Sequence, residues 1–251
     1  MAKPFKVALK EDAPQIGLLL SLPSPEIVEI CVEAGFDWLF LDMEHGLLDF
    51  IITQRMIQAA AGRASCIVRV PANEPVWISK ALDLGADGLI FPHINTAEEA
   101  AACVRAALYP PLGARSIGIA RGQGYGVRVK ETVAGANADV TLIAQAEHID
   151  AARHIESILE VPGIDAVFIG PFDLSASLGL PGKIDDVRVQ DAIGTILAAS
   201  RIRRIPAGIF AAVPEAARAA CTRGFSFVCA GTDSSLLART AKETVDIVRS
   251  R

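Results

Sequence analysis

The chain has 251 residues, of which 51% are hydrophobic and 21% are charged, and its formal net charge is −5 at pH 7. This composition can bury a full core, so the chain is not a disordered protein, and its scattered Lys and Arg residues form no basic stripe that would indicate nucleic-acid binding. The sequence also has no apolar run of about 18 residues that could span a membrane and no apolar targeting core near its N-terminus, so we expect a soluble protein.

Short apolar segments alternate with amphipathic segments along almost the whole chain. The apolar segments are near-continuous, as strands buried on both faces require, and they predict strands at Ile16–Leu20, Trp38–Asp42, Cys66–Arg69, Gly88–Phe91, Leu142–Ala146, Ala166–Ile169, Ala207–Phe210 and Phe227–Ala230. The amphipathic segments predict helices near residues 25–34, 51–61, 75–84, 96–107, 151–160, 187–200, 214–223 and 234–249.

Eight strand–helix repeats without a break in composition predict a closed (β/α)8 TIM barrel, formed by residues 1–251 as a single domain. A doubly wound open sheet is the alternative fold. The alternation of apolar and amphipathic segments is interrupted at Tyr109–Asp139. We expect this segment to form a long loop and then a helix near residues 127–136.

Ionisable residues gather where the predicted strands end, which is the face that carries the chemistry in a barrel of this kind. A purely structural barrel has no need for so many such groups on one rim, so this pattern indicates an enzyme. The residues at the strand ends are Asp42, Glu44, His45, Gly46, Arg69, Pro92, His93, Gln145, Glu147, Gly170, Pro171, Phe172, Asp173, Thr232 and Asp233.

Two of these acids, Glu147 and Asp173, follow the fifth and sixth strands, which are neighbours in a barrel. Carboxylates on adjacent strands can share one divalent cation, and a site with only two oxygen ligands suits Mg²⁺, Mn²⁺ or a similar ion that keeps waters. The alternative for Asp173 is that it only caps the helical turn that follows it.

His45 and Arg69 are the remaining candidates for chemistry at the rim. His45 is interpreted as a general base, with a third metal ligand or a structural loop histidine as alternatives. Arg69 either pairs with Asp42 or Glu44, or binds a substrate carboxylate, and the two roles can coexist. The other three histidines, His93, His148 and His154, are interpreted as structural.

The positions of the lysines and cysteines show which kinds of chemistry the sequence does not favour. None of the seven lysines ends a strand, and only Lys183, in the loop after the sixth strand, is a candidate for a Schiff base, so the sequence favours a metal mechanism. The five cysteines lack paired spacing and are interpreted as buried thiols. Their odd number favours a reducing cytoplasm.

Taken together, the motifs resemble the metal-dependent (class II) pyruvate aldolases of the 4-hydroxy-2-oxoheptane-1,7-dioate aldolase and 2-dehydro-3-deoxyglucarate aldolase family. The resemblance covers nearly the whole chain. Its carriers are the segments Leu41–Gly46, Val68–Pro71, Gly88–Ala100, Tyr109–Arg115, Gln145–Glu147 and Gly170–Ser175.

The resemblance implies a reversible aldol reaction, in which 4-hydroxy-2-oxo acids give pyruvate or hydroxypyruvate and an aldehyde. It implies Glu147 and Asp173 as metal ligands, with Mg²⁺ or Mn²⁺ expected and Co²⁺ or another ion as an alternative. His45 would accept a proton and Arg69 would stabilise the enolate. The substrate-binding residues would be Arg69, Gln145, Gly170, Pro171, Phe172 and Asp173.

The resemblance also implies a homohexamer in which the last helix is exchanged between protomers, and the apolar stripe Leu236, Leu237, Val245 and Val248 is compatible with that exchange. In the family, a carboxylate that falls on Asp83 pairs with the histidine. Because Asp83 ends a helix far from the barrel mouth, we expect this pairing to come from a neighbouring subunit.

The chain departs from the family pattern at Ala72, His148 and Phe172, all around the expected pocket, so the sequence leaves the natural donor and aldehyde open. Two other functions are alternatives. An enolate-forming lyase of the malyl-CoA type would need a basic surface for the CoA phosphates, and the sequence shows no such cluster. A non-catalytic barrel would bind the oxo acid without releasing pyruvate.

Overall fold

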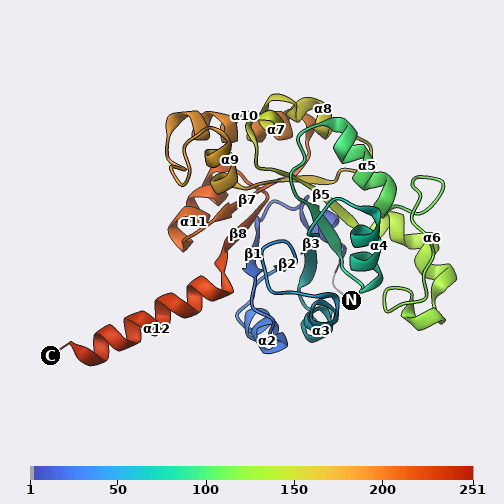
Figure 1. The fold of residues 1–251 in the computed structure, drawn as a ribbon, viewed down its shortest axis with the longest axis horizontal. Coiled ribbons are helices and arrows are strands. Elements are labelled where there is room, and N and C mark those ends of the chain that lie inside the picture. The colour runs from blue at the N-terminus through green and yellow to red at the C-terminus, as the bar shows by residue number, and fades with distance from the viewer. Residues whose placement is uncertain (1–2, 251) are drawn as a thin grey trace.

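The structure, a computed structural model, describes residues 3–250, and at its centre eight parallel strands form a closed barrel (Figure 1). The last strand pairs with the first, so no sheet edge is left open, which confirms the predicted barrel over the open sheet. In chain order the strands are β1 (Gln15–Leu20), β2 (Trp38–Asp42), β3 (Ser65–Arg69), β4 (Gly88–Phe91), β5 (Thr141–Ala146), β6 (Ala166–Ile169), β7 (Ala207–Ala211) and β8 (Phe227–Thr232).

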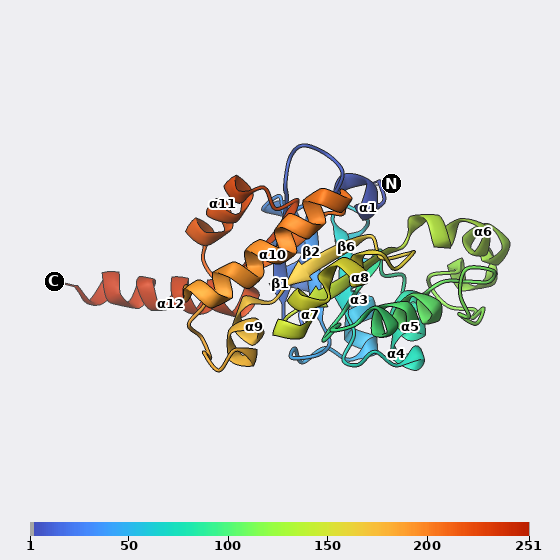
Figure 2. The same cartoon turned by 90° about the horizontal axis from the view of Figure 1, so that it is seen from above.

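Helices surround this barrel in the usual alternation (Figures 1 and 2). Those that the sequence predicted are α2 (Pro25–Glu33), α3 (Phe50–Ala60), α4 (Pro75–Asp83), α5 (Ala97–Ala107), α6 (Val129–Asp139), α10 (Val187–Arg203), α11 (Pro214–Arg223) and α12 (Asp233–Arg249). The structure adds α1 (Phe5–Ala8), the 3₁₀ turn η1 (Gly124–Gly126) and α9 (Pro171–Ser177).

The helix predicted near residues 151–160 is in fact two short helices, α7 (Ile149–Arg153) and α8 (Ile155–Leu159). The break falls at His154, whose backbone has φ −104° and ψ 12°. Its ring Nδ1 lies 3.0 Å from the carbonyl oxygen of Asn95, a contact with the loop after β4 that the sequence pattern does not reveal.

Local chemistry at the helix ends agrees with the sequence. Thr96 caps α5 with its hydroxyl, and Glu99 closes the capping box. Prolines occupy the first turns of α2, α4 and α11, where a missing N–H costs nothing. These short signals fix where each helix starts.

The inside of the barrel is filled by aromatic side chains. Trp38, Phe40, Phe168 and Phe227 pack with ring centroids 5.5–6.2 Å apart. Room for them depends on two glycines, because a Cβ on Gly17 would overlap the Trp38 ring and a Cβ on Gly208 would overlap the Phe227 ring. The barrel is therefore closed below its rim, and a substrate can enter only at the rim.

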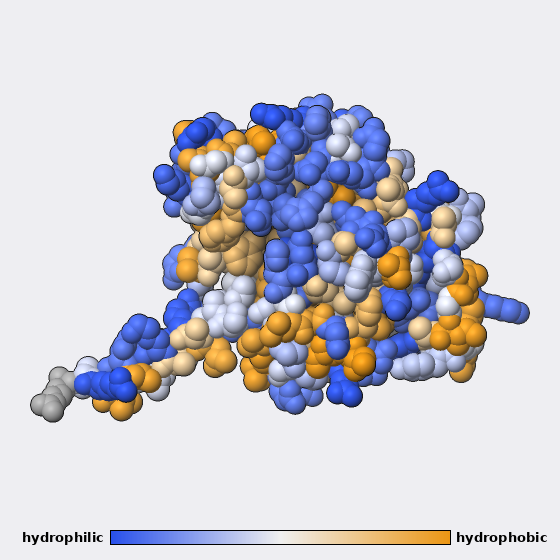
Figure 3. All heavy atoms as spheres, viewed as in Figure 1, coloured by the Kyte–Doolittle hydropathy of each residue, from blue (hydrophilic) through white to orange (hydrophobic). Residues whose placement is uncertain are grey.

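Helix α12 extends away from the barrel, and Asp233 at its start is its only buried residue (Figures 1 and 2). Leu237, Ile247 and Val248 on this helix are exposed. Figure 3 shows the apolar atoms on α12 in orange, and a larger orange area over the part of the barrel where α2 and α3 lie. No helix within residues 3–250 has the length and apolar character needed to cross a membrane.

Candidate active site

The strand register brings the predicted site residues to one level of the barrel. Asp42 at the end of β2 lies beside Arg69 at the end of β3, and Gln145 on β5 pairs with Phe168 on β6. The side chains of Asp42, Arg69 and Gln145 are buried, and Arg69 lies over the ring of Phe40, which belongs to the aromatic filling. The sequence prediction that these polar groups share one rim is confirmed.

Arg69 is the centre of this rim. Its Nε donates to Asp42 Oδ1 at 2.9 Å and its Nη2 donates to Asp42 Oδ2 at 2.7 Å, the two-pronged geometry that holds a guanidinium in a fixed plane. Its carbon Cζ lies 5.1 Å from the centre of the Phe40 ring. Burial works to lower the pKa of Arg69, but the hydrogen bond and charge of Asp42 outweigh it and raise that pKa, so the group stays charged.

Asp42 also holds the loop that follows it. Its Oδ1 accepts hydrogen bonds from the backbone N–H groups of Glu44 at 3.0 Å and His45 at 3.2 Å. A Cβ on Gly46 would overlap the carbonyl oxygen of Asp42, so glycine at this position lets the loop close tightly. One carboxylate thus fixes both Arg69 and the loop that carries His45.

Five side chains form a closed ring of polar contacts around the barrel mouth, which we call the rim ring: Arg69, Glu44, His93, Glu147 and Gln145. Arg69 Nη1 lies 3.0 Å from Glu44 Oε2, and Glu44 Oε1 lies 3.1 Å from His93 Nε2. His93 Nδ1 lies 3.0 Å from Glu147 Oε1, and Gln145 Nε2 donates to Glu147 Oε2. The ring closes through Gln145 Oε1 and Arg69 Nη1 at 3.5 Å, which is its weakest contact.

The sequence analysis missed the place of His93 in this ring, because it treated that residue as structural. His93 has a left-handed backbone with φ 53°, which turns its ring back over the rim, and its side chain remains 62% exposed. A left-handed histidine gives no periodic signal in a sequence. The hint in the sequence is the position of His93 just after the fourth strand, which ends at Phe91.

Glu147 is buried and, among residues 3–250, forms no direct ion pair with an arginine or lysine, although the charge of Arg69 lies near enough to interact with it. Burial raises the pKa of Glu147, against the opposing effects of the backbone N–H and ring of His93 and the amide of Gln145. A single arginine that is already paired with Asp42 and Glu44 compensates the charge of a third buried carboxylate only in part. This shortage is one that a bound cation would remove.

Asp173 lies close in sequence to Gly170, and Gly170 packs against Glu147. A Cβ on Gly170 would come within 3.1 Å of both Cβ and Oε2 of Glu147, so the chain after β6 passes directly by this carboxylate. Asp173 is exposed in the first turn of α9 and accepts no hydrogen bond from residues 3–250. Its carboxylate is therefore not occupied in capping within the described part of the chain, and carboxylate oxygens are the ligands that hard divalent cations take.

Within residues 3–250 no three His, Cys, Asp or Glu side chains are grouped so as to hold a metal ion by themselves. The pair Glu147 and Asp173 as metal ligands, and the alternative of His45 as a third ligand, both stay predictions. The side chain of His45 is 68% exposed, and its Nε2 lies 3.9 Å from Glu44 Oε2. This exposure leaves His45 accessible to a substrate above the rim.

Asp83 lies elsewhere in this chain. It ends α4, which runs from the rim back toward the face where the strands begin, and its Oδ1 accepts hydrogen bonds from Arg115 Nη2 at 2.8 Å and Gln123 Nε2 at 2.9 Å. These contacts connect it to the long segment between α5 and β5. The position agrees with the expectation that Asp83 does not reach His45 of the same chain.

Asp233 has a structural task at the rim. It accepts hydrogen bonds from the backbone N–H groups of Ser21 and Leu22 and from the Ser21 hydroxyl, which ties the loop after β1 to the start of α12.

His148 caps α7 by accepting from the N–H of Asp150 at 3.2 Å. The structural interpretation of His148 is therefore confirmed.

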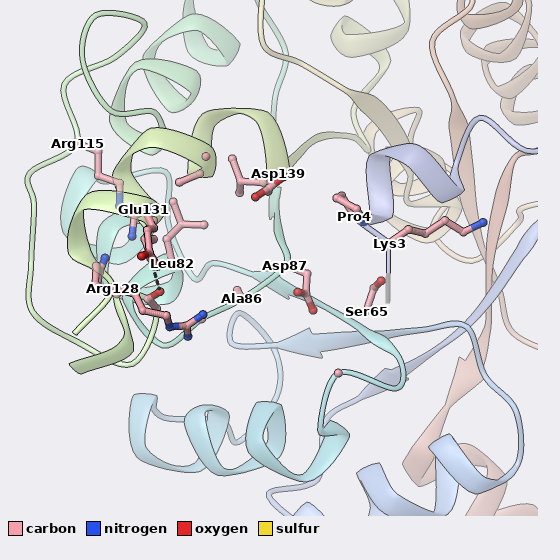
Figure 4. A pocket seen from close by; sticks show the side chains of 18 of the residues that line it. Lys3, Pro4, Ser65, Leu82, Ala86, Asp87, Arg115, Arg128, Glu131 and Asp139 are labelled. Atoms are coloured by element: carbon pink, nitrogen blue, oxygen red, sulfur yellow. Dashed lines mark hydrogen bonds between the residues drawn. The ribbon is translucent and has the colours of Figure 1, made fainter. Parts of the chain in front are cut away.

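A cavity of about 500 Å³ lies on the opposite face, where the strands begin (Figure 4). Its charged residues, Lys3, Arg115 and Arg128 against Asp87, Glu131 and Asp139, balance one another. Asp87 is moreover used by the fold, since it accepts from the backbone N–H of Cys66 at 2.8 Å. The charged residues that line the cavity therefore give it no net charge that would favour an anion or a cation.

The cysteines behave as the sequence predicts for structural thiols. All five are free, and four of them are buried. Burial raises the pKa of Cys31 to about 11 and that of Cys103 to about 12, and it raises the pKa values of the other three thiols too. Thiols with raised pKa values are poor nucleophiles near neutral pH.

Known proteins resemble this chain over nearly its whole length. The profile of the HpcH/HpaI aldolase/citrate lyase family matches residues 15–240. A 4-hydroxy-2-oxovalerate aldolase of Rhodococcus jostii is 41% identical over 237 residues, which cover 94% of this chain and 92% of the relative. A hydroxypyruvate/pyruvate aldolase of Paraburkholderia phytofirmans is 39% identical over 255 residues, which cover 98% of each. The crystal structure of an HpcH/HpaI aldolase/citrate lyase family protein from Burkholderia cenocepacia superposes with a TM-score of 0.94 at 37% identity, covering 98% of this chain and 99% of that one.

Proposed function

This chain belongs to the HpcH/HpaI aldolase/citrate lyase family, and from that premise we propose that it is an aldehyde-lyase acting on 4-hydroxy-2-oxo acids. It cleaves them reversibly to an aldehyde and either pyruvate or hydroxypyruvate. The observation that carries this proposal is the charge pattern of the rim. One arginine, Arg69, lies among the carboxylates Asp42, Glu44 and Glu147, with Asp173 on the next segment of the rim.

This excess of negative charge suits a divalent cation, with Glu147 and Asp173 as its protein ligands. Mg²⁺ and Mn²⁺ are the expected ions, because both prefer oxygen ligands and keep waters in the remaining positions. When bound, such an ion supplies positive charge beside the keto oxygen of the substrate and so makes the carbon next to it more acidic.

The side chains around that position divide the remaining work. Gln145 and the segment Gly170–Asp173, including the backbone of Phe172, hold the 2-oxo acid group. Arg69 keeps one N–H group on Nη2 that Asp42 does not use, while its Nη1 contacts Glu44 and Gln145, and we infer that this Nη2 group serves the negative charge that grows on the substrate. Because Asp42 already fixes the guanidinium, little reorganisation is needed during the reaction.

His45 acts as the proton acceptor. It takes the proton of the C4 hydroxyl, the C3–C4 bond breaks, the aldehyde leaves, and the electron pair remains on the three-carbon fragment. Addition of a proton at C3 of that fragment then gives pyruvate. Asp83 of a second copy of the chain aligns His45, as the family resemblance implies.

The enzyme acts as a homo-oligomer, with a hexamer as the expected state. Exposed apolar side chains on α12 and on the segments near α2 and α3 support this assembly, because large apolar patches on a surface mark interaction sites. They are Ile30, Leu47, Ile51, Leu237, Ile247 and Val248. We also propose a cytoplasmic location, which the five free thiols support.

The test is pyruvate release from 4-hydroxy-2-oxo acids of graded length, followed with coupled lactate dehydrogenase. Chelator-treated protein should be inactive, and Mg²⁺ or Mn²⁺ added singly should restore turnover. Lys183→Ala is the control and should retain activity, because no Schiff base is required. Full turnover in exhaustive chelator would exclude the cation, and tight binding without release of pyruvate would identify a non-catalytic barrel.

A further inference from the structure

His93 joins the two carboxylates on either side of the barrel mouth. Its Nε2 contacts Glu44, which is paired with Arg69, and its Nδ1 contacts Glu147. We propose that His93 is a positioning residue, whose imidazole holds the Glu147 carboxylate in the orientation needed to bind the cation. This inference rests on the cation site of the proposed function.

The two oxygens of Glu147 face different surroundings. Oε1 accepts from the backbone N–H of His93 at 2.8 Å and lies 3.0 Å from the Nδ1 of the same residue. Oε2 accepts from the amide of Gln145 and lies toward Gly170, at the start of the segment that carries Asp173. His93 engages only Oε1, so the imidazole holds one oxygen of the carboxylate and makes no contact with the other.

The loop that carries His93 is fixed independently of its imidazole. Asn73 Nδ2 donates to the carbonyl oxygen of Pro92 at 2.6 Å, the N–H of Ile94 donates to the carbonyl oxygen of Gln145 at 3.2 Å, and His154 contacts the carbonyl oxygen of Asn95. The left-handed backbone at His93 is therefore maintained by its neighbours. Removal of the imidazole should leave this loop in place.

Packing does not explain the imidazole either, since 62% of the side chain is exposed while both ring nitrogens contact carboxylates. A side chain that serves the core is normally buried. Groups that hydrogen-bond a metal-ligating carboxylate set its orientation, and their loss commonly reduces metal affinity about 10- to 100-fold.

The experiment measures Mn²⁺ binding to chelator-treated protein by titration calorimetry, which does not depend on turnover. His93→Gly keeps a residue that tolerates positive φ and removes the ring. We expect its Kd for Mn²⁺ to rise about 10-fold, the low end of the range, because the backbone N–H still holds Oε1. Free imidazole added to this variant should restore much of the affinity, because the site is open to solvent.

Two further variants make the result specific. His93→Asn also tolerates a left-handed backbone, and its shorter side chain cannot span Glu44 and Glu147, so its affinity should change in the same direction should His93→Gly fold poorly. Arg63→Met is the control, because Arg63 forms an exposed pair with Glu33 on the face where the strands begin, and it should bind Mn²⁺ as the wild type does.

The outcomes separate this inference from the function on which it rests. Wild-type Mn²⁺ affinity in His93→Gly, or a tighter Kd, would overturn the positioning role even if the enzyme is an active aldolase. Loss of affinity that imidazole does not restore in a folded variant would also overturn it. A wild-type protein that binds Mn²⁺ but releases no pyruvate would contradict the aldolase function and leave the role of His93 to be decided by binding alone.

Discussion

Replacement of Arg69 by methionine is expected to affect activity and stability by separate routes. Methionine retains much of the apolar stem but removes the charge that Asp42 and Glu44 surround. The side chains of Asp42 and Arg69 are 2% and 7% exposed, so solvent screens the uncompensated carboxylate very little. Loss of one partner from a buried ion pair typically costs about 3–5 kcal/mol.

That cost is a large part of the total stability of a typical domain, about 5–15 kcal/mol. At about 2–4 °C per kcal/mol for a chain of this size, the melting temperature of Arg69→Met should fall by about 6–20 °C. Removal of a group that stabilises developing negative charge commonly lowers kcat about 10²- to 10³-fold. We expect a loss in that range at temperatures where the variant is folded.

A second substitution separates the two effects. Adding Asp42→Asn to Arg69→Met replaces the unpaired carboxylate with a neutral amide whose oxygen can still accept the N–H groups of Glu44 and His45. The double variant should regain part of the lost melting temperature but none of the lost turnover. Arg63→Met is the control, because Arg63 forms an exposed pair with Glu33, and such pairs contribute at most about 1 kcal/mol.

The assays are calorimetry for the melting temperature and pyruvate release with saturating cation for kcat. Near-normal turnover in the folded double variant would refute the assignment of Arg69 to charge stabilisation. An unchanged melting temperature in Arg69→Met would instead show that Asp42 does not depend on its partner.

Three further predictions address other parts of the chain. Because burial raises their pKa values, the buried thiols should be almost entirely protonated at pH 8, so the native protein should react slowly with a thiol reagent such as DTNB. Protein unfolded in guanidinium should show all five thiols, and rapid labelling of the native protein would contradict their buried placement. Phe172 is 43% exposed and packs edge-on against Phe210, with ring centroids 6.1 Å apart. Phe172→Ser should therefore lower kcat/KM for apolar aldehydes about 10-fold relative to polar ones in the aldol-addition assay, and an unchanged ratio would show that Phe172 does not select the aldehyde. Truncation after Ser234 removes the exposed apolar residues of α12 and should reduce the oligomer mass measured by light scattering, which stays constant if α12 makes no intersubunit contact.

Much of the fold could be read from the sequence because its signals are local. Continuous apolar runs predicted all eight strands to within two residues at either end. This works because apolar and polar residues do not alternate along a strand that is buried on both faces. Glycines after α2, α4 and α11 have φ of 90°, 88° and 87°, which only glycine adopts readily, so they mark helix ends reliably. The residues of the rim could be predicted as well, because all the parallel strands of a barrel end on the same face.

Tertiary structure decided how those rim residues pair. The structure shows that Arg69 pairs with both Asp42 and Glu44, which the strand register brings beside it, and its role toward a substrate carboxylate stays a prediction. The role of His93 depends on a left-handed backbone that distant groups, including Asn73 and His154, hold in place. Hydrogen bonds between residues tens of positions apart in the chain carry no signature in local composition or periodicity, so the sequence determined which groups reach the barrel mouth, and only the folded chain determined which of them touch.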